Sequence, residues 1–463
     1  MNIQSIHRVH FLGIGGIGMS AIARWFNHLG KVVTGYDRTP SALTDALALE
    51  GMAISFDDSE AAIPAAIKED KESCLIVWTP AIPKDAVQLN YFLSKGYALH
   101  KRAEVLGFIT AGIPTVAVAG THGKTTTSSM VAHLLKVGGV NISAFLGGLT
   151  QNYQSNLILP DQDLSEPVVV VEADEFDRSF LHLHPNSAVL TSVDPDHLDI
   201  YGDDQEMLQG FKSFVSLIPA NGKLYISEGA SQKLPLAGLK VQDIRVYGLG
   251  KVGYAASNIK PLPGSFVFDY SNPQTVIEGL ELHMPGYHNV ENAVAAISIA
   301  LDFGISEEAV REGIASFRGV KRRFEILVQK ENQVFIDDYA HHPEEIKAFL
   351  GSVKAMYPQH KLTAVFQPHL FSRTRDFAKD FSKSLSLADH VVLLDIYPAR
   401  ELPMEGVTSA MLLDDILSDQ KTLQTKENLI PYLEQHRPEV LVTIGAGDID
   451  RLVEPLTKFM QEG

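Results

Sequence analysis

One segment constrains the fold more than any other, because it joins a predicted buried strand directly to a predicted helix. The strand is Thr115–Ala119, and the turn that follows reads Gly-Thr-His-Gly-Lys-Thr-Thr from Gly120 to Thr126. Glycine-rich turns before a helix hold phosphate groups with their backbone N–H groups. The spacing is a shortened P-loop, because Val118 stands where the full motif has its first glycine. The segment therefore predicts an α/β sheet that carries a nucleotide, with an ordinary strand-to-helix turn as the alternative.

Within this turn, the residue types suit different parts of a nucleotide triphosphate. Lys124 can offset the charge of the β- and γ-phosphates, and the Thr125 hydroxyl can join a Mg²⁺ coordination shell. We expect the phosphates of a nucleotide to contact Gly120, Thr121, His122, Gly123, Lys124, Thr125 and Thr126, the residues to which the family resemblance described below assigns ATP.

Composition narrows the function classes. The chain has 463 residues, enough for about three domains by the usual prior. Lys plus Arg number 39 and Asp plus Glu number 56, so the net charge of −17 argues against a general nucleic-acid binder. Cys74 is the only cysteine, which leaves no disulfide framework. No apolar run approaches the roughly 20 residues that cross a bilayer, so we expect a cytoplasmic protein without membrane insertion.

Strands and helices alternate along the chain, which predicts an α/β fold of open, mostly parallel sheets. We predict three domains, at residues 1–107, 108–318 and 319–463: Rossmann-like, P-loop NTPase-like and again Rossmann-like. The clearest predicted elements are the strands Val9–Leu12, Lys31–Gly35, Val168–Val171, Leu362–Phe366 and Val440–Ile444 and the helices Met19–Leu29 and Val290–Phe303.

A second glycine-rich turn lies in the first domain. Gly13, Gly15 and Gly18 fit the spacing G-x-G-x-x-G between a predicted strand and helix, and Gly16 adds a further glycine. The helix N-terminus favours a diphosphate, which NAD and a UDP-sugar both contain. Asp37 follows the next strand and either meets a ribose hydroxyl or is simply solvated. A tight packing turn without a ligand is the alternative for the glycines.

Acidic residues cluster after two predicted strands of the central domain. Glu172-Ala-Asp-Glu-Phe-Asp177 follows one strand, and Asp194-Pro-Asp-His-Leu-Asp199 follows another. Open parallel sheets bind ligands at this carboxyl edge, and Mg²⁺ prefers oxygen ligands. Glu172 is thus a good magnesium ligand and His197 a less usual one. We expect Mg²⁺, with Mn²⁺ as the other candidate, against the alternative of two solvated acidic loops.

Five segments together carry a family resemblance. They are the loop at Gly120, Glu-Ala-Asp-Glu at Glu172, Asp-His-Leu-Asp at Asp196, His-Asn-x-x-Asn at His288 and Arg322-Arg323. In this combination the chain resembles the ATP-dependent Mur ligases of peptidoglycan precursor synthesis, over essentially its whole length. The segments Asp337–Pro343 and Phe366–Arg375 are most similar to the branch of the family that adds L-alanine.

The resemblance implies a ligand for each domain: UDP-N-acetylmuramate on the first, ATP on the second and the amino acid on the third. It assigns the UDP-sugar to Gly13, Gly15, Gly16, Gly18 and Asp37, and the metal to Thr125, Glu172 and His197. It places Asn289 and Asn292 at adenine, and their spacing puts both amides on one helix face. A helix cap is the alternative role for these asparagines. Arg323 and Asp338 are implied as further ATP contacts.

For the amino acid, the resemblance implies Tyr339, His341, His369 and Arg373. Arg373 can hold the substrate carboxylate with two parallel hydrogen bonds. His341 or His342 can accept a proton from the amine, or a histidine can only orient it. Leu370 stands where close relatives often carry Arg, which leaves one anionic contact unassigned. The implied catalytic residues are Lys124, Glu172, His197, His341 and Arg373.

The expected reaction is ATP-dependent amide formation through an acyl phosphate. The lactyl carboxylate of UDP-N-acetylmuramate attacks the γ-phosphate, and L-alanine then displaces phosphate. One alternative is a recycling ligase that adds a murein tripeptide to the same UDP-sugar. A nicotinamide-dependent dehydrogenase and a nucleotide-binding module without turnover are the others. The expected partners are small molecules, and the expected assembly is a monomer or a homodimer.

Overall fold

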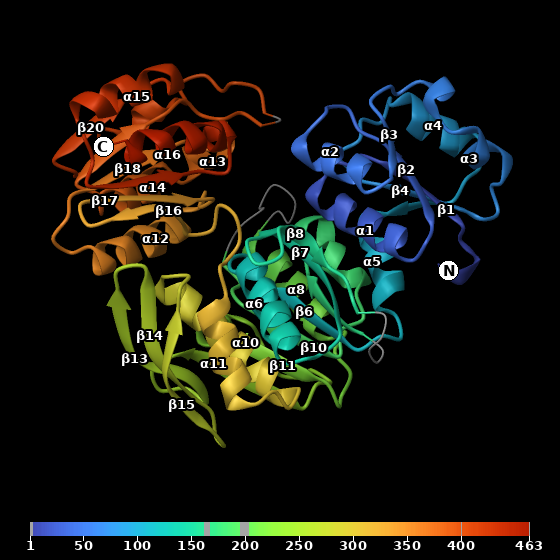
Figure 1. Ribbon diagram of the computed structural model, residues 1–463, viewed down its shortest axis with the longest axis horizontal. Helices are drawn as coiled ribbons and strands as arrows, with labels where there is room; N and C mark the ends of the chain where they lie inside the picture. The colour runs from blue at the N-terminus through green and yellow to red at the C-terminus, as the bar shows by residue number, and fades with distance from the viewer. Residues whose placement is uncertain (1–2, 162–166, 195–202, 400, 463) are drawn as a thin grey trace. The chain divides into compact units, whose positions relative to one another are not determined.

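The computed structural model describes residues 3–161, 167–194, 203–399 and 401–462, which form three sheets (Figure 1). The chain divides into two compact units, each made of two segments. Unit 1 comprises Met1–Tyr254 and Val294–Gly313, and unit 2 comprises Ala255–Ala293 and Ile314–Gly463. Strands alternate with helices in most of both units, so the predicted α/β class is confirmed.

The N-terminal sheet of unit 1 is wholly parallel, with the strand order β3-β2-β1-β4-β5. Its strands are β1 (Arg8–Leu12), β2 (Val32–Tyr36), β3 (Ala53–Ser55), β4 (Cys74–Trp78) and β5 (Leu99–Lys101). Its helices are α1 (Ile17–His28), α2 (Ala42–Leu49), α3 (Ala65–Glu69), α4 (Val87–Ser94) and α5 (Arg102–Thr110). The strand order reverses between β1 and β4, and such a reversal is where open sheets bind ligands. The turn at Gly13 follows β1 and lies at this point.

Seven strands of the ten-stranded second sheet lie in unit 1, in the order β12-β11-β10-β6-β9-β7-β8, and they are parallel except for the pair β7 and β8. Its strands are β6 (Thr115–Ala119), β7 (Ile142–Thr150), β8 (Ser155–Ile158), β9 (Val168–Glu172), β10 (Ser187–Leu190), β11 (Lys223–Ser227) and β12 (Asp243–Leu249). Its helices include α6 (Lys124–Val137), α8 (Asp204–Val215), α9 (Glu228–Lys233) and the 3-10 helix η3 (Phe176–His182). The nucleotide loop therefore follows a central strand.

Helix α1 joins the two sheets of unit 1. The Trp25 ring lies 6.2 Å from the ring of Phe145 on β7, and both belong to one continuous apolar core. Asn156 of β8 donates to the carbonyl of Ile17 and accepts from Arg24 at 2.8 Å. The glycine-rich turn before α1 is consequently fixed against the second sheet.

Unit 2 contains three antiparallel strands and a six-stranded sheet. The antiparallel strands are β13 (Tyr254–Leu262), β14 (Ser265–Ser271) and β15 (Val276–Leu282). The sheet has the order β16-β17-β21-β18-β19-β20 and is parallel except for β16. Its strands are β16 (Glu325–Lys330), β17 (Gln333–Asp338), β18 (Leu362–Phe366), β19 (His390–Leu393), β20 (Gln420–Leu423) and β21 (Val440–Ile444). Its helices are α12 (Pro343–Met356), α13 (Phe371–Asp376), α14 (Ala378–Leu385), α15 (Lys426–Gln435) and α16 (Val453–Gln461).

Two helices, α10 (Tyr287–Asp302) and α11 (Glu307–Ser316), contribute residues to both units, because the unit boundaries fall inside them. The predicted domain boundary at 107/108 lies within α5, and the one at 318/319 lies between α11 and β16. The three-domain boundaries stay a prediction. Within the described part of the chain, no helix is both long and apolar enough to span a membrane.

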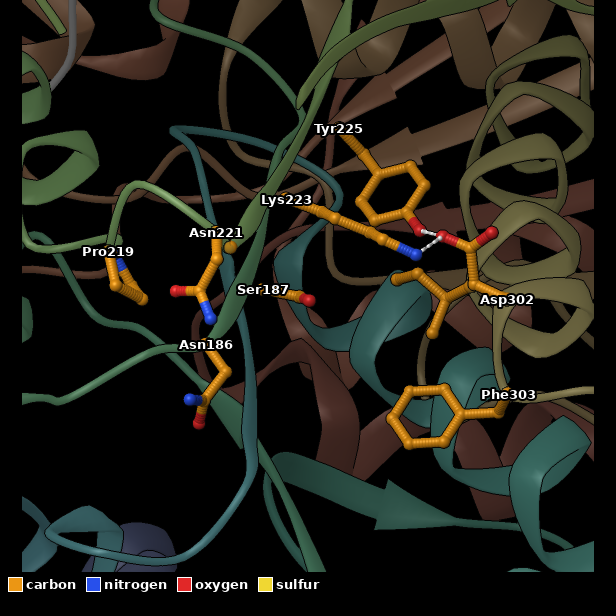
Figure 2. A pocket seen from close by; sticks show the side chains of 10 residues that line it. Asn186, Ser187, Pro219, Asn221, Lys223, Tyr225, Asp302 and Phe303 are labelled. Atoms are coloured by element: carbon orange, nitrogen blue, oxygen red, sulfur yellow. Dashed lines mark hydrogen bonds and ion pairs between the residues drawn. The ribbon is translucent and has the colours of Figure 1, made fainter. Parts of the chain in front are cut away.

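A polar cluster ties β11 and β12 to the end of α10 within unit 1. Figure 2 shows Lys223 and Tyr225 pointing toward Asp302, which accepts from Lys223 Nζ at 2.8 Å and from the Tyr225 hydroxyl. Arg245 of β12 donates to the same carboxylate. Burial raises the pKa of Tyr225 well above its usual range. The cluster borders a pocket of about 290 Å³ that contains none of the predicted active-site residues.

Candidate active site

The turn between β6 and α6 has the left-handed backbone that its glycines permit. Gly120 has a φ of 139° and Gly123 a φ of 81°, conformations that strain other residues. A Cβ atom on Gly120 would collide with Thr191, so this glycine also lets the turn approach β10. Lys124 is the first residue of α6, whose N-terminus favours an anion. The strand, the turn and the helix lie where the sequence predicts them.

The two residues after β10 hold the nucleotide loop in place. Ser192 Oγ accepts from the backbone N–H of His122 at 2.8 Å and lies 2.9 Å from Thr121 Oγ1. The backbone N–H of Thr121 donates to the Ser192 carbonyl at 3.2 Å. Thr191 donates to the carbonyl of Ala119 at 3.1 Å. Sequence reasoning missed these residues, although a Thr-Ser pair directly after a buried run on the neighbouring strand was a usable signal.

Lys124 forms a buried ion pair with Glu175. The Lys124 Nζ donates to Glu175 Oε1 at 2.7 Å and to the carbonyl of Gly120 at 2.7 Å. The Glu175 side chain is only 1% exposed. Burial raises the pKa of Glu175 to about 7, and the charge of Lys124 opposes this rise. In this structure the Lys124 ammonium group is therefore paired with Glu175 and hydrogen-bonded to the backbone of Gly120 in the loop that precedes it. Glu175 was not among the predicted site residues.

The predicted metal ligands lie on neighbouring elements. Glu172 ends β9 and pairs in register with Val118 of β6, and Thr125 lies in the first turn of α6. Glu172 Oε2 accepts from the backbone N–H of Gly147 at 2.9 Å. His197 lies outside the described residues. Among those described, no group of three His, Cys, Asp or Glu side chains is arranged for a metal. A hydroxyl and a carboxylate oxygen suit Mg²⁺, which takes further oxygen ligands from water and phosphate.

Asp37 has a role that neither sequence interpretation included. Its Oδ2 accepts from the backbone N–H of Gly15 at 2.7 Å, and its Oδ1 accepts from Thr39 N–H at 3.3 Å. The carboxylate thus braces the glycine-rich turn. Gly13 has a φ of 88°, Gly16 precedes α1, and Gly18 lies in the first turn of that helix. The predicted diphosphate residues are together at the start of α1.

Asn289 and Asn292 are buried side by side on α10. The Asn292 Nδ2 donates to Asn289 Oδ1 at 3.4 Å, as the three-residue spacing predicts. The Asn289 Nδ2 also donates to the carbonyl of Pro285 at 2.7 Å, so it closes the turn that starts the helix. Burial lowers the pKa of the neighbouring His288 to about 4, which leaves a neutral ring beside the two amides.

Asp338 organises the backbone at the end of β17. Its two oxygens accept from the N–H groups of Phe324 and Ala340, both at 2.7 Å. Burial raises the pKa of Asp338 to about 6, and Arg323 opposes the rise. The Arg323 guanidinium lies 5.0 Å from the centre of the Tyr339 ring. Arg323 and Asp338, two of the predicted ATP contacts, therefore lie near one another.

The predicted amino-acid residues of unit 2 form an aromatic row. The ring of His341 lies 5.6 Å from that of Tyr339 and 6.1 Å from that of His369. Arg373 is buried on α13, four residues after His369. The structure therefore brings Tyr339, His341 and His369 together, with Arg373 on the adjoining helix.

The structure separates the roles of the two candidate proton acceptors. His342 is the N-cap of α12, and its Nδ1 accepts from the Glu344 N–H at 3.4 Å. His341 Nδ1 lies 3.5 Å from Glu345 Oε2, and its ring is part of the aromatic row. His341 therefore lies among the predicted amino-acid residues, whereas His342 caps a helix.

Leu370 has an unusual backbone for its residue type. Its φ is 69°, and its N–H donates to the carbonyl of Tyr397 at 3.0 Å just before α13. A branched side chain is strained at positive φ. The residue thus sets the direction in which the chain enters α13 and leads toward Arg373.

Family models match three consecutive stretches of the chain. The Mur ligase family catalytic domain matches residues 8–113, the Mur ligase middle domain matches residues 118–300, and the Mur ligase glutamate ligase domain matches residues 322–447. These stretches correspond in order to the N-terminal sheet, the nucleotide loop with its sheet, and the C-terminal sheet.

Individual relatives match over almost the whole length. A UDP-N-acetylmuramate–L-alanine ligase from Flavobacterium psychrophilum is 50% identical over 462 residues, 100% of both chains. One from Porphyromonas gingivalis is 50% identical over 459 residues, 98% of this chain and 99% of the relative. The crystal structure of a UDP-N-acetylmuramate-alanine ligase from Thermotoga maritima aligns with a TM-score of 0.79 at 28% identity, covering 97% and 99% of the two chains. A murein peptide ligase from Psychrobacter arcticus shares the fold, with a TM-score of 0.68, 22% identity and 98% of each chain covered.

Proposed function

The chain belongs to the Mur ligase family, and we propose that it joins L-alanine to the lactyl carboxylate of UDP-N-acetylmuramate with ATP. One observation carries the proposal: the loop Gly120–Gly123 and Lys124 form a phosphate-binding helix start in a chain that matches alanine-adding relatives from end to end. The product is an amide, and ADP and phosphate are released.

The loop and Lys124 carry the phosphoryl transfer. The lactyl carboxylate attacks the γ-phosphorus, the bond to the β,γ-bridging oxygen breaks, and an acyl phosphate and ADP form. Charge grows on the phosphoryl oxygens in this step, and preorganised N–H donors and a cation stabilise it. The backbone N–H groups of Gly120–Gly123 and the Lys124 ammonium are such donors. For this task Lys124 shifts from Glu175 toward the phosphates.

The proposed metal ligands are Thr125, Glu172 and His197, with Mg²⁺ as the ion. When bound, Mg²⁺ neutralises phosphate charge and fixes the geometry of the phosphates. Thr125 and Glu172 supply oxygen atoms from α6 and β9, elements that meet at the nucleotide loop. Glu172 stays oriented by the Gly147 N–H.

The second step uses the residues of the aromatic row. The alanine amine attacks the acyl-phosphate carbonyl, and phosphate leaves. In our proposal Arg373 holds the carboxylate of alanine, His341 accepts the amine proton, and Tyr339 and His369 line the site. The glycine-rich turn at Gly13–Gly18 and Asp37 hold the UDP-sugar. Asn289, Asn292, Arg323 and Asp338 contact ATP.

We further propose the compartment, the assembly and the partners of the protein. The substrates are small molecules, the compartment is the cytoplasm, and the assembly is a monomer or a homodimer without nucleic acid. The acidic net charge of −17 is consistent with the absence of a nucleic-acid partner.

The test is phosphate release by the purified protein with ATP and UDP-N-acetylmuramate at saturating Mg²⁺. L-Alanine, glycine, L-serine, D-glutamate and the murein tripeptide are offered in parallel. We expect release that requires both the UDP-sugar and L-alanine. Glycine should give weaker release, because one methyl group contributes only roughly 1 to 3 kcal/mol to discrimination, and serine should also give weaker release, because an apolar pocket rejects an added hydroxyl only in part. Release with the tripeptide alone would reassign the chain to recycling, and no release with any acceptor would refute ligation.

A further inference from the structure

Arg102 reaches across the junction between the two sheets of unit 1. It is the first residue of α5, and its Nη2 donates to Asp174 Oδ2 at 2.9 Å. A Cβ atom on Gly18 would collide with the guanidinium group, so the glycine at this position leaves the space that Arg102 occupies. The side chain is 25% exposed. Arg102 therefore contacts both the start of α1 and the segment after β9.

A cavity of about 220 Å³ lies at this junction. Three parts of unit 1 line it: the start of α1, the first two turns of α5, and the region where β7 and β9 meet. Its lining residues include Gly18, Arg102, Leu106, Phe145, Glu172 and Asp174. The cavity thus runs from the turn proposed for the diphosphate to Glu172, the carboxylate proposed as a metal ligand.

One cationic side chain and two anionic side chains meet at the cavity. Arg102 is the cationic side chain in the lining, and Glu172 and Asp174 are the anionic ones. A carboxylate that enters here is repelled by both acids unless a cation receives it. Arginine receives a carboxylate with two parallel hydrogen bonds. In this structure Arg102 already pairs with a carboxylate, that of Asp174.

Asp174 can release Arg102 and still keep a hydrogen bond, and its side chain is partly exposed to water. Its other oxygen, Oδ1, accepts from the backbone N–H of Phe176 at 3.0 Å. The ion pair is partly exposed, and such pairs contribute at most about 1 kcal/mol. Replacing Asp174 by another carboxylate as the partner of Arg102 therefore requires little free energy.

We propose that Arg102 binds the lactyl carboxylate of the UDP-sugar in this cavity, where it replaces Asp174 as the partner of the guanidinium. Arg102 then aims the nucleophilic oxygen from the α1 side toward the phosphate-binding loop. It also selects a UDP-sugar that carries an acid over one that does not. This inference rests on the proposed function, because it assigns a contact to the same substrate.

Arg102 is not needed to hold the two sheets of unit 1 together. Asn156 bonds the carbonyl of Ile17, and Trp25 packs near Phe145, so other contacts fix α1 against the second sheet. A substitution at Arg102 is accordingly expected to leave the fold intact, and a melting temperature checks this.

The experiment compares two UDP-sugars that differ in the lactyl group. Dissociation constants are measured by calorimetry for UDP-N-acetylmuramate and for UDP-N-acetylglucosamine, which shares the nucleotide, the diphosphate and the acetamido sugar but lacks the acid. The proteins are the unmodified full chain, R102Q, R102K and the control R8Q. Arg8 pairs with Asp70 at 3.0 Å at the start of β1, whereas the glycine-rich turn follows the other end of the same strand.

We expect the unmodified chain to prefer UDP-N-acetylmuramate. R102Q should weaken its binding roughly 10- to 100-fold, the size of a lost charge-assisted hydrogen bond, and leave UDP-N-acetylglucosamine unchanged. R102K should recover part of the loss, and R8Q should bind both sugars normally.

Three results would overturn the inference while the unmodified chain remains an active ligase. They are an equal loss for both sugars in R102Q, which would place Arg102 at the diphosphate, no loss for either sugar, and no preference between the sugars in the unmodified chain. An unmodified chain that neither binds nor turns over UDP-N-acetylmuramate would instead refute the proposed function.

Discussion

At the residue scale, the ion pair of Lys124 and Glu175 couples catalysis to stability. Both side chains lie away from solvent, and the carboxylate is almost completely buried. Removing one member of such a pair leaves an uncompensated charge. The phosphate-binding lysine is therefore also a structural residue, and a loss of activity after its replacement has two causes that must be separated.

A double replacement separates them. We expect K124M to lose phosphate release and about 3 kcal/mol of stability, the cost of breaking a buried ion pair. K124M/E175Q should regain most of that stability, because a neutral amide needs no cationic partner, and should still release no phosphate. Urea unfolding and the phosphate assay check this. A double variant as unstable as K124M would show that the loss does not come from the unpaired carboxylate of Glu175.

His10 predicts a loss of stability in acid. It is buried between Thr34 and Gln88, and burial lowers its pKa to about 4, against the opposing effect of the hydrogen bond that His10 Nε2 donates to Gln88 Oε1. An unfolded histidine titrates near 6.5, so between pH 6.5 and 4 the unfolded chain binds a proton that the folded chain does not. The contribution of His10 is thus complete above pH 6.5 and is lost as the pH falls toward 4.

The H10Q variant isolates this effect. The free energy of unfolding of the unmodified chain, relative to that of H10Q, should be lower at pH 5 than at pH 7.5 by about 2 kcal/mol. The reason is that only the unmodified chain has a histidine at this position, with a folded pKa of about 4, that takes up a proton on unfolding at pH 5. Urea unfolding at the two pH values measures it. The same difference at both would contradict the assignment.

Residue types in short motifs could be predicted, but their partners could not. Gly120 and Lys124 were found because a phosphate-binding turn needs them in a fixed local order. Glu175 and Arg102 were missed because their roles depend on contacts with residues 51 and 72 positions away. Asp37 was found, yet its bond to Gly15 depends on how two strands lie beside each other.

At the element scale, the end of β10 acts as a support for the nucleotide loop. Ser192 bonds the backbone of His122 and the hydroxyl of Thr121 without itself belonging to the proposed ATP contacts. Elements that preorganise a loop reduce the cost of ordering it around a ligand. The support should therefore affect the affinity for ATP.

We expect S192A to raise the dissociation constant for ATP about 5- to 30-fold, since it removes two hydrogen bonds that contribute up to about 1 kcal/mol each, and to leave the affinity for UDP-N-acetylmuramate unchanged. The matched control is S187A, at the other end of the same strand. Calorimetric titration of both variants tests this. Equal effects of S187A and S192A would mean that damage to the strand, rather than the loop support, is responsible.

Elements with a strong apolar pattern were predicted well. The buried runs that became β9, β18 and β21 are recognisable because parallel strands are apolar on both faces. The antiparallel strands β13, β14 and β15 were not predicted, because less buried residues interrupt their buried positions and their pairing register shifts, so they contain no continuous apolar run. Helix α1 begins at Ile17 rather than Met19, a difference within the usual fraying of helix ends.

At the scale of the whole molecule, the two compact units carry different predicted ligands. The proposed UDP-sugar residues all lie in unit 1, and the proposed amino-acid residues all lie in unit 2. A ligand that binds one unit stabilises that unit by mass action. Substrates should therefore protect separate parts of the chain.

Hydrogen exchange tests this separation. UDP-N-acetylmuramate alone should slow exchange in α1 and β1 and leave β17 and β21 as they were, because the latter contain no proposed contact with the sugar. Equal slowing in both sets of elements would contradict it. UDP-N-acetylglucosamine serves as the control for the diphosphate contacts.

The number of sheets could be predicted from the sequence, but the grouping of segments could not. The three predicted domains are contiguous stretches, because a pattern read along the chain can only divide it in order. The observed units each combine two separate stretches, with α10 and α11 passing through the boundary. Which distant segment completes a unit depends on tertiary contacts that have no local signature.

This interleaving has a consequence for the order in which the protein can fold as it leaves the ribosome. Unit 1 lacks its last segment until Gly313 has been made, whereas β13, β14 and β15 emerge earlier and belong to unit 2. At about 5 to 20 residues per second, the 59 residues from 254 to 313 take roughly 3 to 12 seconds to synthesise. Until α10 is complete at Asp302, the surface of unit 1 that receives the second half of this helix is open to solvent, and a chaperone can bind the nascent chain there.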